Sequence, residues 1–162
     1  MVRRIPRWLA RAPIPLLRTG FGRLLGRRVA MLEHRGRVSG LPRYVVLEVI
    51  GRRPDGVDVV SGYGVRSQWY RNVLARPEVR LWCGRSVGVP ARATPLPADR
   101  PRTVLADYRD RHRRAARALG RTLDLADLVH AGPLPTDIAD RLPVVRITTE
   151  PEVAAPGSPG PG

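Results

Sequence analysis

The sequence contains a single cysteine, Cys83, and no lysine. One thiol cannot form an intramolecular disulfide and excludes a metal cluster held by several thiolates, so we expect a reducing compartment. The three histidines, His34, His112 and His130, lie far apart in the chain and form neither an i, i+4 pair nor an HExxH motif. We therefore predict no zinc site and interpret these histidines as surface or helix-end residues.

Long hydrophobic runs are also missing, since no apolar stretch approaches the roughly 20 residues that a membrane-spanning helix needs. Residues 7–28 interleave arginine with Trp, Leu, Ile and Phe, unlike the unbroken apolar stretch of a secretory signal. Residues 1–28 are predicted to form a basic amphipathic helical segment that either caps the core or rests on anionic lipid headgroups. We expect a cytoplasmic protein, either free or peripheral to the inner face of the cell membrane.

All 29 basic residues are arginines, and with 14 acidic residues they give a formal net charge of +15. Because Ala, Gly, Pro and Val are also abundant, this usage is typical of a GC-rich coding sequence, and part of the charge reflects codon bias. Guanidinium groups nevertheless suit planar, bidentate contacts with phosphate or carboxylate. The composition therefore favours an anionic ligand or surface over a merely solvated exterior.

The 162-residue chain is long enough for one domain with a core of its own. Apolar, β-branched segments bounded by turn residues predict six strands, at 29–34, 42–50, 57–61, 78–83, 87–94 and 142–148. Residues 44–50 of the second strand are nearly all apolar, which suits burial on both faces. We assign the domain to residues 29–149 and predict a disordered tail over residues 150–162, which are rich in Pro and Gly.

Two helices interrupt the strands. A short one is predicted to start after the N-cap Ser67 and to end before Pro77. A longer one is predicted from Arg100 to Leu119, capped by Asp99. Its apolar face comprises Leu105, Tyr108, His112, Ala115 and Leu119. Residues 121–141 look partly helical. Because hairpins join most of the strands, we predict an α+β fold, an antiparallel β-barrel of about six strands with flanking helices.

The predicted hairpin Gly36-Arg37-Val38-Ser39-Gly40-Leu41-Pro42-Arg43 combines glycines, a hydroxyl and two arginines. Glycine lets backbone N–H groups turn toward one point, and Ser39, Arg37 and Arg43 add further donors. The segment could be an ordinary polar hairpin, or it could bind a phosphate group.

A second loop, Ser61-Gly62-Tyr63-Gly64-Val65-Arg66-Ser67, runs from a strand directly into the short helix, whose free N–H groups favour an anion. It is not a dinucleotide-binding fingerprint, because serine replaces the third glycine and the helix is too short. The helix then carries Gln68-Trp69-Tyr70-Arg71-Asn72. Since adjacent helical residues point in different directions, we expect one aromatic ring in the core and the other, with Asn72, near a ligand.

Taken together, the two loops resemble the nitroreductase/quinone reductase family of deazaflavin-dependent oxidoreductases. The family pattern Gly-Arg-x-Ser/Thr-Gly-x-Pro-Arg matches residues 36–43, and its later Ser, Trp-Tyr-x-Asn and Ala/Arg-x-Pro elements match Ser61, residues 69–72 and residues 75–77. The resemblance covers roughly residues 8–148. It implies a split β-barrel of the FMN-binding split barrel-like class, which binds coenzyme F-420, an 8-hydroxy-5-deazaflavin.

The resemblance also implies which residues hold the coenzyme. Arg37, Ser39 and Arg43 would contact its phosphate end. The full set of implied contacts is Arg37, Val38, Ser39, Gly40, Arg43, Tyr44, Val45, Ser61, Gly62, Tyr63, Arg66, Gln68, Trp69, Tyr70, Arg71 and Asn72. The implied reaction is hydride transfer from reduced coenzyme F-420 to an electron-poor acceptor such as a quinone, nitroaromatic or enone, with the protein supplying orientation and protonation.

The chain differs from the family pattern in several features, and the most important concerns the residues that protonate the substrate. The family's late tyrosines, which form a lid and help to protonate the substrate, are missing, since residues 121–141 contain none. The turn before Trp69 is also shorter, and its basic residue is Arg66 where the family has lysine. Ser61 and Tyr63 are therefore our candidates for the catalytic role.

Other functions stay open at this point. Related split barrels bind FMN or haem, and FMN is the alternative cofactor. The charge and the run at residues 109–114 also suggest a nonspecific nucleic-acid binder. That run is more simply the solvent-facing side of a helix, and no reading motif accompanies it, so we expect no specific nucleic-acid partner. The expected partner is a small-molecule electron acceptor, and the chain is compatible with a homodimer.

Overall fold

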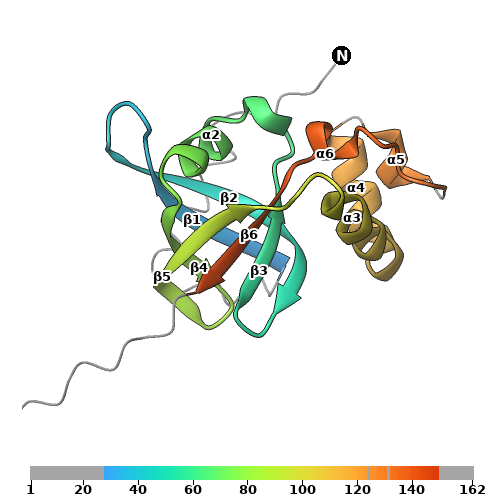
Figure 1. The fold of residues 1–162 in the computed structure, drawn as a ribbon. Helices are drawn as coiled ribbons and strands as arrows, with labels where there is room; N and C mark the ends of the chain where they lie inside the picture. The colour runs from blue at the N-terminus through green and yellow to red at the C-terminus, as the bar shows by residue number, and fades with distance from the viewer. Residues whose placement is uncertain (1–27, 124, 131, 150–162) are drawn as a thin grey trace, which may run out of the picture.

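The computed structural model describes residues 28–123, 125–130 and 132–149. Its six strands pair in the order β1-β2-β3-β6-β5-β4 and close into a barrel in which every neighbouring pair is antiparallel (Figure 1). The strands are β1 (Val29–Arg35), β2 (Pro42–Arg53), β3 (Gly56–Val60), β4 (Glu78–Cys83), β5 (Ser86–Pro95) and β6 (Val144–Thr149). This confirms the predicted barrel. The predicted amphipathic segment, apart from Arg28, and the predicted tail over residues 150–162 lie outside the described residues.

Hairpins join β1 to β2, β2 to β3 and β4 to β5, at the turn residues that the sequence indicated. The last strand, β6, lies between β3 and β5 and completes the cylinder. A barrel closed in this way leaves no unpaired strand edge. The hairpin tips therefore project from its two ends, and β1–β2 projects at the opposite end from β4–β5 (Figure 1).

The barrel interior is filled by alternate residues of the strands, as the period of two requires. Ala30 and Leu32 of β1 and Val57 and Val59 of β3 belong to this cluster. One end of the barrel is covered by the 3-10 helix η3 (Gly64–Arg66) and by α2 (Gln68–Ala75). The segment that follows β3 in the chain thus supplies the cover of this end.

Trp69 and Tyr70 of α2 both pack into this interior cluster, with only 8% and 9% of their surface exposed. Their rings meet edge to face at 6.1 Å. The expectation that one of them would reach a ligand while the other packed is therefore not met. The reason is tertiary: the helix lies across the open end of the barrel, so neighbouring positions both face apolar side chains.

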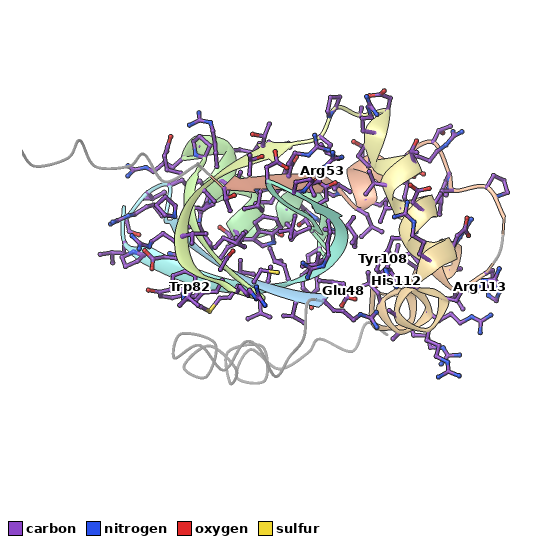
Figure 2. The ribbon with its side chains drawn as sticks, turned by 90° about the horizontal axis from the view of Figure 1, so that it is seen from below. Glu48, Arg53, Trp82, Tyr108, His112 and Arg113 are labelled. Atoms are coloured by element: carbon purple, nitrogen blue, oxygen red, sulfur yellow. The ribbon has the colours of Figure 1, made fainter. Side chains whose placement is uncertain are left out.

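A second apolar cluster lies between the outer barrel wall and four helices, α3 (Arg100–Arg111), α4 (Arg113–Leu123), α5 (Ala126–Val129) and α6 (Ile138–Arg141). Figure 2 shows Tyr108 of α3 close to Glu48 on the wall, and its hydroxyl donates to Glu48 Oε1 at 2.8 Å. Burial, and then this hydrogen bond, raise the pKa of Tyr108. The pair attaches the helical layer to β2, so β2 is covered on both faces.

The single helix predicted over 100–119 is wrong in one respect, because the backbone leaves the helical region at His112 (φ −130°, ψ 50°). The break changes the phase of the second half, so that Ala116 is fully buried. Gly120, expected just beyond the helix, lies inside α4, where a Cβ would come within 2.8 Å of the Leu125 carbonyl oxygen. Close packing of α5 on α4 explains the glycine.

Asp58 of β3 is a buried carboxylate with two arginine partners. Its oxygens lie 3.3 Å from Arg53 Nε and 3.0 Å from Arg146 Nε, and its side chain is only 3% exposed. These pairs connect β2, β3 and β6 on the barrel wall.

Among the described residues, no helix is long and apolar enough to cross a membrane.

Candidate functional site

The β1–β2 hairpin lies alongside α2 at one end of the barrel (Figure 1). Near its start, Arg37 bonds to the first two turns of the helix through Gln68 and Asn72. Near its end, Gly40 lies beside Arg76, since a Cβ on Gly40 would be 3.8 Å from Arg76 Nη1. The hairpin therefore follows the helix along its length, and the two predicted ligand segments are neighbours.

Arg37 is held to α2 by two neutral side chains. Its Nη1 donates to Gln68 Oε1 at 2.8 Å and to Asn72 Oδ1 at 3.1 Å, and its backbone N–H donates to the same Asn72 oxygen at 3.1 Å. No carboxylate of the described residues lies within ion-pair distance of its guanidinium. The position of Arg37 is thus set without cancellation of its charge.

Asn72 and His34 lie behind Arg37, in the protein interior. They are 3% and 4% exposed, and Asn72 Nδ2 lies 3.2 Å from His34 Nδ1. His34 also faces Arg43 across the β1–β2 ladder. Burial, and then the charge of Arg43, lower the pKa of His34 to about 4, against the opposing effect of a hydrogen bond from the imidazole to the Arg35 backbone.

The interior position of His34 corrects the interpretation of this residue as a surface or helix-end histidine. Its place in the strand could have shown the error, because His34 is in phase with Ala30 and Leu32, which both face the interior. His112 and His130 do lie at helix ends, one between α3 and α4 and the other after α5.

The tip of the hairpin presents several donors to solvent. Ser39 Oγ and Arg43 Nε lie over Gly36, at 2.6 and 3.0 Å from where its Cβ would be. The backbone N–H groups of Gly36, Gly40 and Leu41 bond within the hairpin, whereas those of Val38 and Ser39 have no acceptor among the described residues. The glycines close the turn, and the tip residues carry the available N–H groups.

Arg35 and Arg76 add to this cluster, although neither was among the site residues predicted from the sequence. Arg35 Nη1 donates to the Gly40 carbonyl oxygen at 3.3 Å, and Arg76 lies beside the same glycine. Strand alternation points Arg35 away from the interior side of His34, and Arg76 immediately follows α2. Both arginines are recognised as site residues only from the folded structure, which brings them next to Gly40.

The hairpin and the segment that runs from the second loop through α2 carry charge of one sign only. Residues 35–43 and 61–77 contain six arginines and no aspartate or glutamate. None of the six pairs with a carboxylate of the described residues. An excess of arginine leaves many unpaired elsewhere too, so the informative feature is their concentration around one hairpin and one helix. This donor set, with Ser39 and two free N–H groups, fits a phosphate-bearing anion.

The second loop, residues 61–67, is held by hydrogen bonds within the loop and packs closely against α6. Ser61 is completely buried, and its hydroxyl donates to the Gly64 carbonyl oxygen at 2.9 Å and lies 2.7 Å from Ser67 Oγ. Gly64 has a positive φ of 65°, and a Cβ there would be 3.2 Å from the Asp140 carbonyl oxygen. Ser67 is the N-cap residue, although its hydroxyl bonds to Ser61 and makes no cap hydrogen bond. These contacts give Ser61 a supporting position in the loop.

Tyr63, the other candidate for the catalytic role, is exposed over 60% of its surface. The rest of the loop lies near it in sequence, with Gly62 half-buried and Arg66 exposed. By contrast, burial and the nearby charge of Asp140 raise the pKa of Tyr70, whose ring is in the core. Of the two tyrosines in this region, only Tyr63 presents its side chain broadly to solvent.

The remaining predicted contact residues are distributed around the hairpin and α2. Val38 is 91% exposed at the hairpin tip, and Val45 packs against the interior cluster. Tyr44 donates to Glu33 Oε2 at 2.8 Å, on the barrel exterior. Arg71 is exposed on α2, and its Nε donates to the Val65 carbonyl oxygen at 3.3 Å. The structure thus gathers most of these residues at one end of the barrel and places Tyr44 on its outer side.

Comparisons with solved structures give distant likenesses. The heme storage protein HutZ from Vibrio cholerae is 13% identical, with a TM-score of 0.49, and the match covers 88% of this chain and 91% of that one. An F420-H2 dependent reductase, FDR-A, is 18% identical, with a TM-score of 0.47 and coverage of 75% and 94%. PhzG from Burkholderia lata is 17% identical, with a TM-score of 0.49 and coverage of 88% and 73%.

The comparison with protein-family models is decisive. No curated protein matches the sequence significantly. The model of the F420H(2)-dependent quinone reductase family matches residues 17–121, well over half of the 162-residue chain. This match spans β1 to β5, the arginine hairpin, α2 and α3. The chain therefore belongs to the F420H(2)-dependent quinone reductase family and is an oxidoreductase with a split β-barrel fold.

Proposed function

We propose that this protein transfers a hydride from reduced coenzyme F-420 to an electron-poor acceptor, with a quinone as the first candidate and nitroaromatics and enones as others. The observation that carries the proposal is the convergence, where the hairpin meets α2, of arginines that have no carboxylate partner among the described residues. Arg37, Arg43 and Arg76 present positive charge and N–H donors beside the Ser39 hydroxyl, and none of these arginines pairs with a carboxylate of the described residues. Such a set selects a phosphorylated coenzyme over a neutral one.

In this proposal the hairpin holds the phosphate end of the coenzyme. Arg37 and Arg43 contribute charge, and the N–H groups of Val38 and Ser39 complete an anion site of backbone donors. Arg35 and Arg76 enlarge the positive field around the tip. The ring system would then extend from the hairpin along the exposed side of α2 and the second loop, beside Gly62, Tyr63 and Gln68.

The reaction itself is a two-electron transfer, which the deazaflavin ring supplies when bound. The chain contributes binding, orientation and protonation. We assign the proton-donor role to Tyr63, because its side chain is exposed beside the helix whereas the Ser61 hydroxyl is buried and already donates to a carbonyl oxygen. Val65, just before α2, and Leu74, within α2, are both exposed, which suits a flat apolar acceptor.

The test follows the absorbance of reduced coenzyme F-420 during oxidation by a panel of quinones and nitroaromatics. We expect Arg37→Gln to raise the Kd for the coenzyme about ten- to hundredfold, because hydrogen bonds to charged groups are worth roughly 1.5–3 kcal/mol. The matched control is Arg85→Gln, since Arg85 is an exposed arginine in the β4–β5 hairpin turn at the other end of the barrel. It should bind the coenzyme like the wild type.

The outcome against the proposal is also specific. Absence of acceptor-dependent oxidation, together with tight binding of FMN, would assign the same donor set to a flavin phosphate. Equal losses of affinity in Arg37→Gln and Arg85→Gln would mean that overall charge attracts the coenzyme. In that case the hairpin would not be a binding site.

A further inference from the structure

Two buried polar side chains, Asn72 and His34, have no direct role in the reaction proposed above. Each is nearly inaccessible to solvent, yet together they form the only hydrogen-bonded link that the described residues show between Arg37 and the barrel interior. Buried polar groups are costly unless their hydrogen bonds are satisfied. The burial of these two polar side chains therefore needs a physical explanation.

The orientation of the Asn72 amide is determined by its neighbours. Its Oδ1 accepts from both the backbone N–H and the Nη1 of Arg37, each at 3.1 Å. Neither donor can accept a hydrogen bond, so a flipped amide would place its NH₂ group against two N–H groups. The NH₂ group must therefore face His34.

That orientation in turn sets the state of the histidine. Because Asn72 Nδ2 donates, His34 Nδ1 must offer a lone pair at 3.2 Å, and the ring proton must be on Nε2. The side-chain charge that acts on the ring is positive, and it is that of Arg43 across the ladder. No carboxylate favours the imidazolium form, so the ring stays neutral.

The result is an arginine held by neutral groups alone. Elsewhere on the barrel, Arg53 and Arg146 are held by the Asp58 carboxylate, which cancels charge as it positions them. Arg37 is positioned through Asn72 and Gln68, so its full charge stays available. An aspartate at position 72 would satisfy the same N–H donors but would neutralise the guanidinium.

We infer that Asn72, supported by neutral His34, is a positioning residue that presents Arg37 with its charge uncancelled to the phosphate of the coenzyme. The inference rests on the proposed function for the identity of that phosphate. It goes further in naming a residue that acts through another and in stating why an amide, and not a carboxylate, occupies this position.

The test compares Asn72→Asp and Asn72→Ala with the wild-type full chain. The two probes are coenzyme F-420 and the same deazaflavin lacking its phosphate-bearing side chain, with binding followed by tryptophan quenching. For coenzyme F-420 we expect Asn72→Asp to raise the Kd about ten- to hundredfold, and Asn72→Ala to raise it less, because alanine leaves the charge of Arg37 intact. The Kd of the phosphate-free probe should not change.

A spectroscopic measurement checks the same arrangement without any ligand. Nitrogen NMR of the imidazole should show an unprotonated Nδ1 and a protonated Nε2 in the wild type at neutral pH. In Asn72→Asp the new carboxylate favours the imidazolium, so the pKa of His34 should rise. Val87→Asp is the control, because it adds the same charge at an exposed site on β5, at the far end of the barrel. It should change neither the protonation of the two imidazole nitrogens nor the pKa of His34.

Two results of the binding experiment would count against the role of Asn72. Wild-type affinity for coenzyme F-420 in Asn72→Asp would overturn the inference, as would equal losses for the two probes, since these would indicate general damage to the groove. Thermal unfolding shows whether the variants are folded. If the wild type does not bind coenzyme F-420 at all, the proposed function fails. The inference is then judged on inorganic pyrophosphate, with the same ranking of the variants required.

Discussion

Replacement of His34 by glutamine should remove an acid-induced loss of stability that the wild type shows. The imidazole is 4% exposed, and its pKa falls from an ordinary value of 6.5 to about 4 in the folded chain. The unfolded chain therefore binds a proton at a pH where the folded chain does not. By linkage, the stabilising effect of the neutral ring is complete above pH 6.5 and is lost as the pH falls toward 4.

The two pKa values give the size of this effect. Between pH 7 and pH 5 the free energy of unfolding of the wild type should fall by about 2 kcal/mol from His34 alone, and by about 3 kcal/mol by pH 4. Glutamine does not titrate, and its carbonyl oxygen can accept from Asn72. The His34→Gln variant should therefore show only the pH dependence that arises from the carboxylates, which both proteins share.

Denaturant unfolding at several pH values, followed by tryptophan fluorescence, measures the difference. The relevant quantity is the free energy of unfolding of the wild type minus that of His34→Gln, which should decrease as the pH is lowered from 7 to 5. Parallel curves over that range would refute the reasoning. They would show that His34 is either solvated or already charged in the folded protein, and the lone pair assigned to Nδ1 would be wrong.

Three further substitutions probe the packing that positions the site. Tyr108→Phe removes the hydrogen bond to Glu48 and should lower the free energy of unfolding by about 1 kcal/mol in denaturant titrations, and an unchanged midpoint would contradict the attachment of the helical layer to β2. Asp58→Asn removes the carboxylate that Arg53 and Arg146 share and, because both arginines are partly exposed, should cost about 1.5 kcal/mol, seen as a lower melting temperature; an unchanged melting temperature would contradict the pairing. Gly64→Ala forces a side chain into positive φ and should cost about 1–3 kcal/mol, measured by chemical denaturation, whereas wild-type stability would mean that the loop relaxes.

Much of the barrel was predictable because strands and hairpins follow from neighbouring residues. Alternation, β-branched side chains and turn residues are read over a few positions, and the six strands lie where those signals placed them. The motif at residues 36–43 likewise sits in one short segment, and the match to the family model includes it. Local chemistry was sufficient in these cases.

The errors occurred where packing overrides local preference. Nothing in the residues around His112 stops a helix, and the break reflects the fit of α3 and α4 to one apolar cluster. Trp69 and Tyr70 share an interior because the helix covers the barrel end, although helical periodicity separates them. His34 is buried at a strand end that its polarity suggested was exposed.

The amino-acid sequence alone determined where the strands and the hairpin turns lie. It also determined that residues 35–43 and 61–77 are rich in arginine and contain no aspartate or glutamate. Closure of the barrel decided which of these groups meet: Arg37 reaches Asn72 across 35 positions of the chain. Strand and turn preferences arise within a few residues, so they can be read locally. A hydrogen bond between distant side chains depends on how the whole chain packs, and only the folded molecule brings its donor to its acceptor.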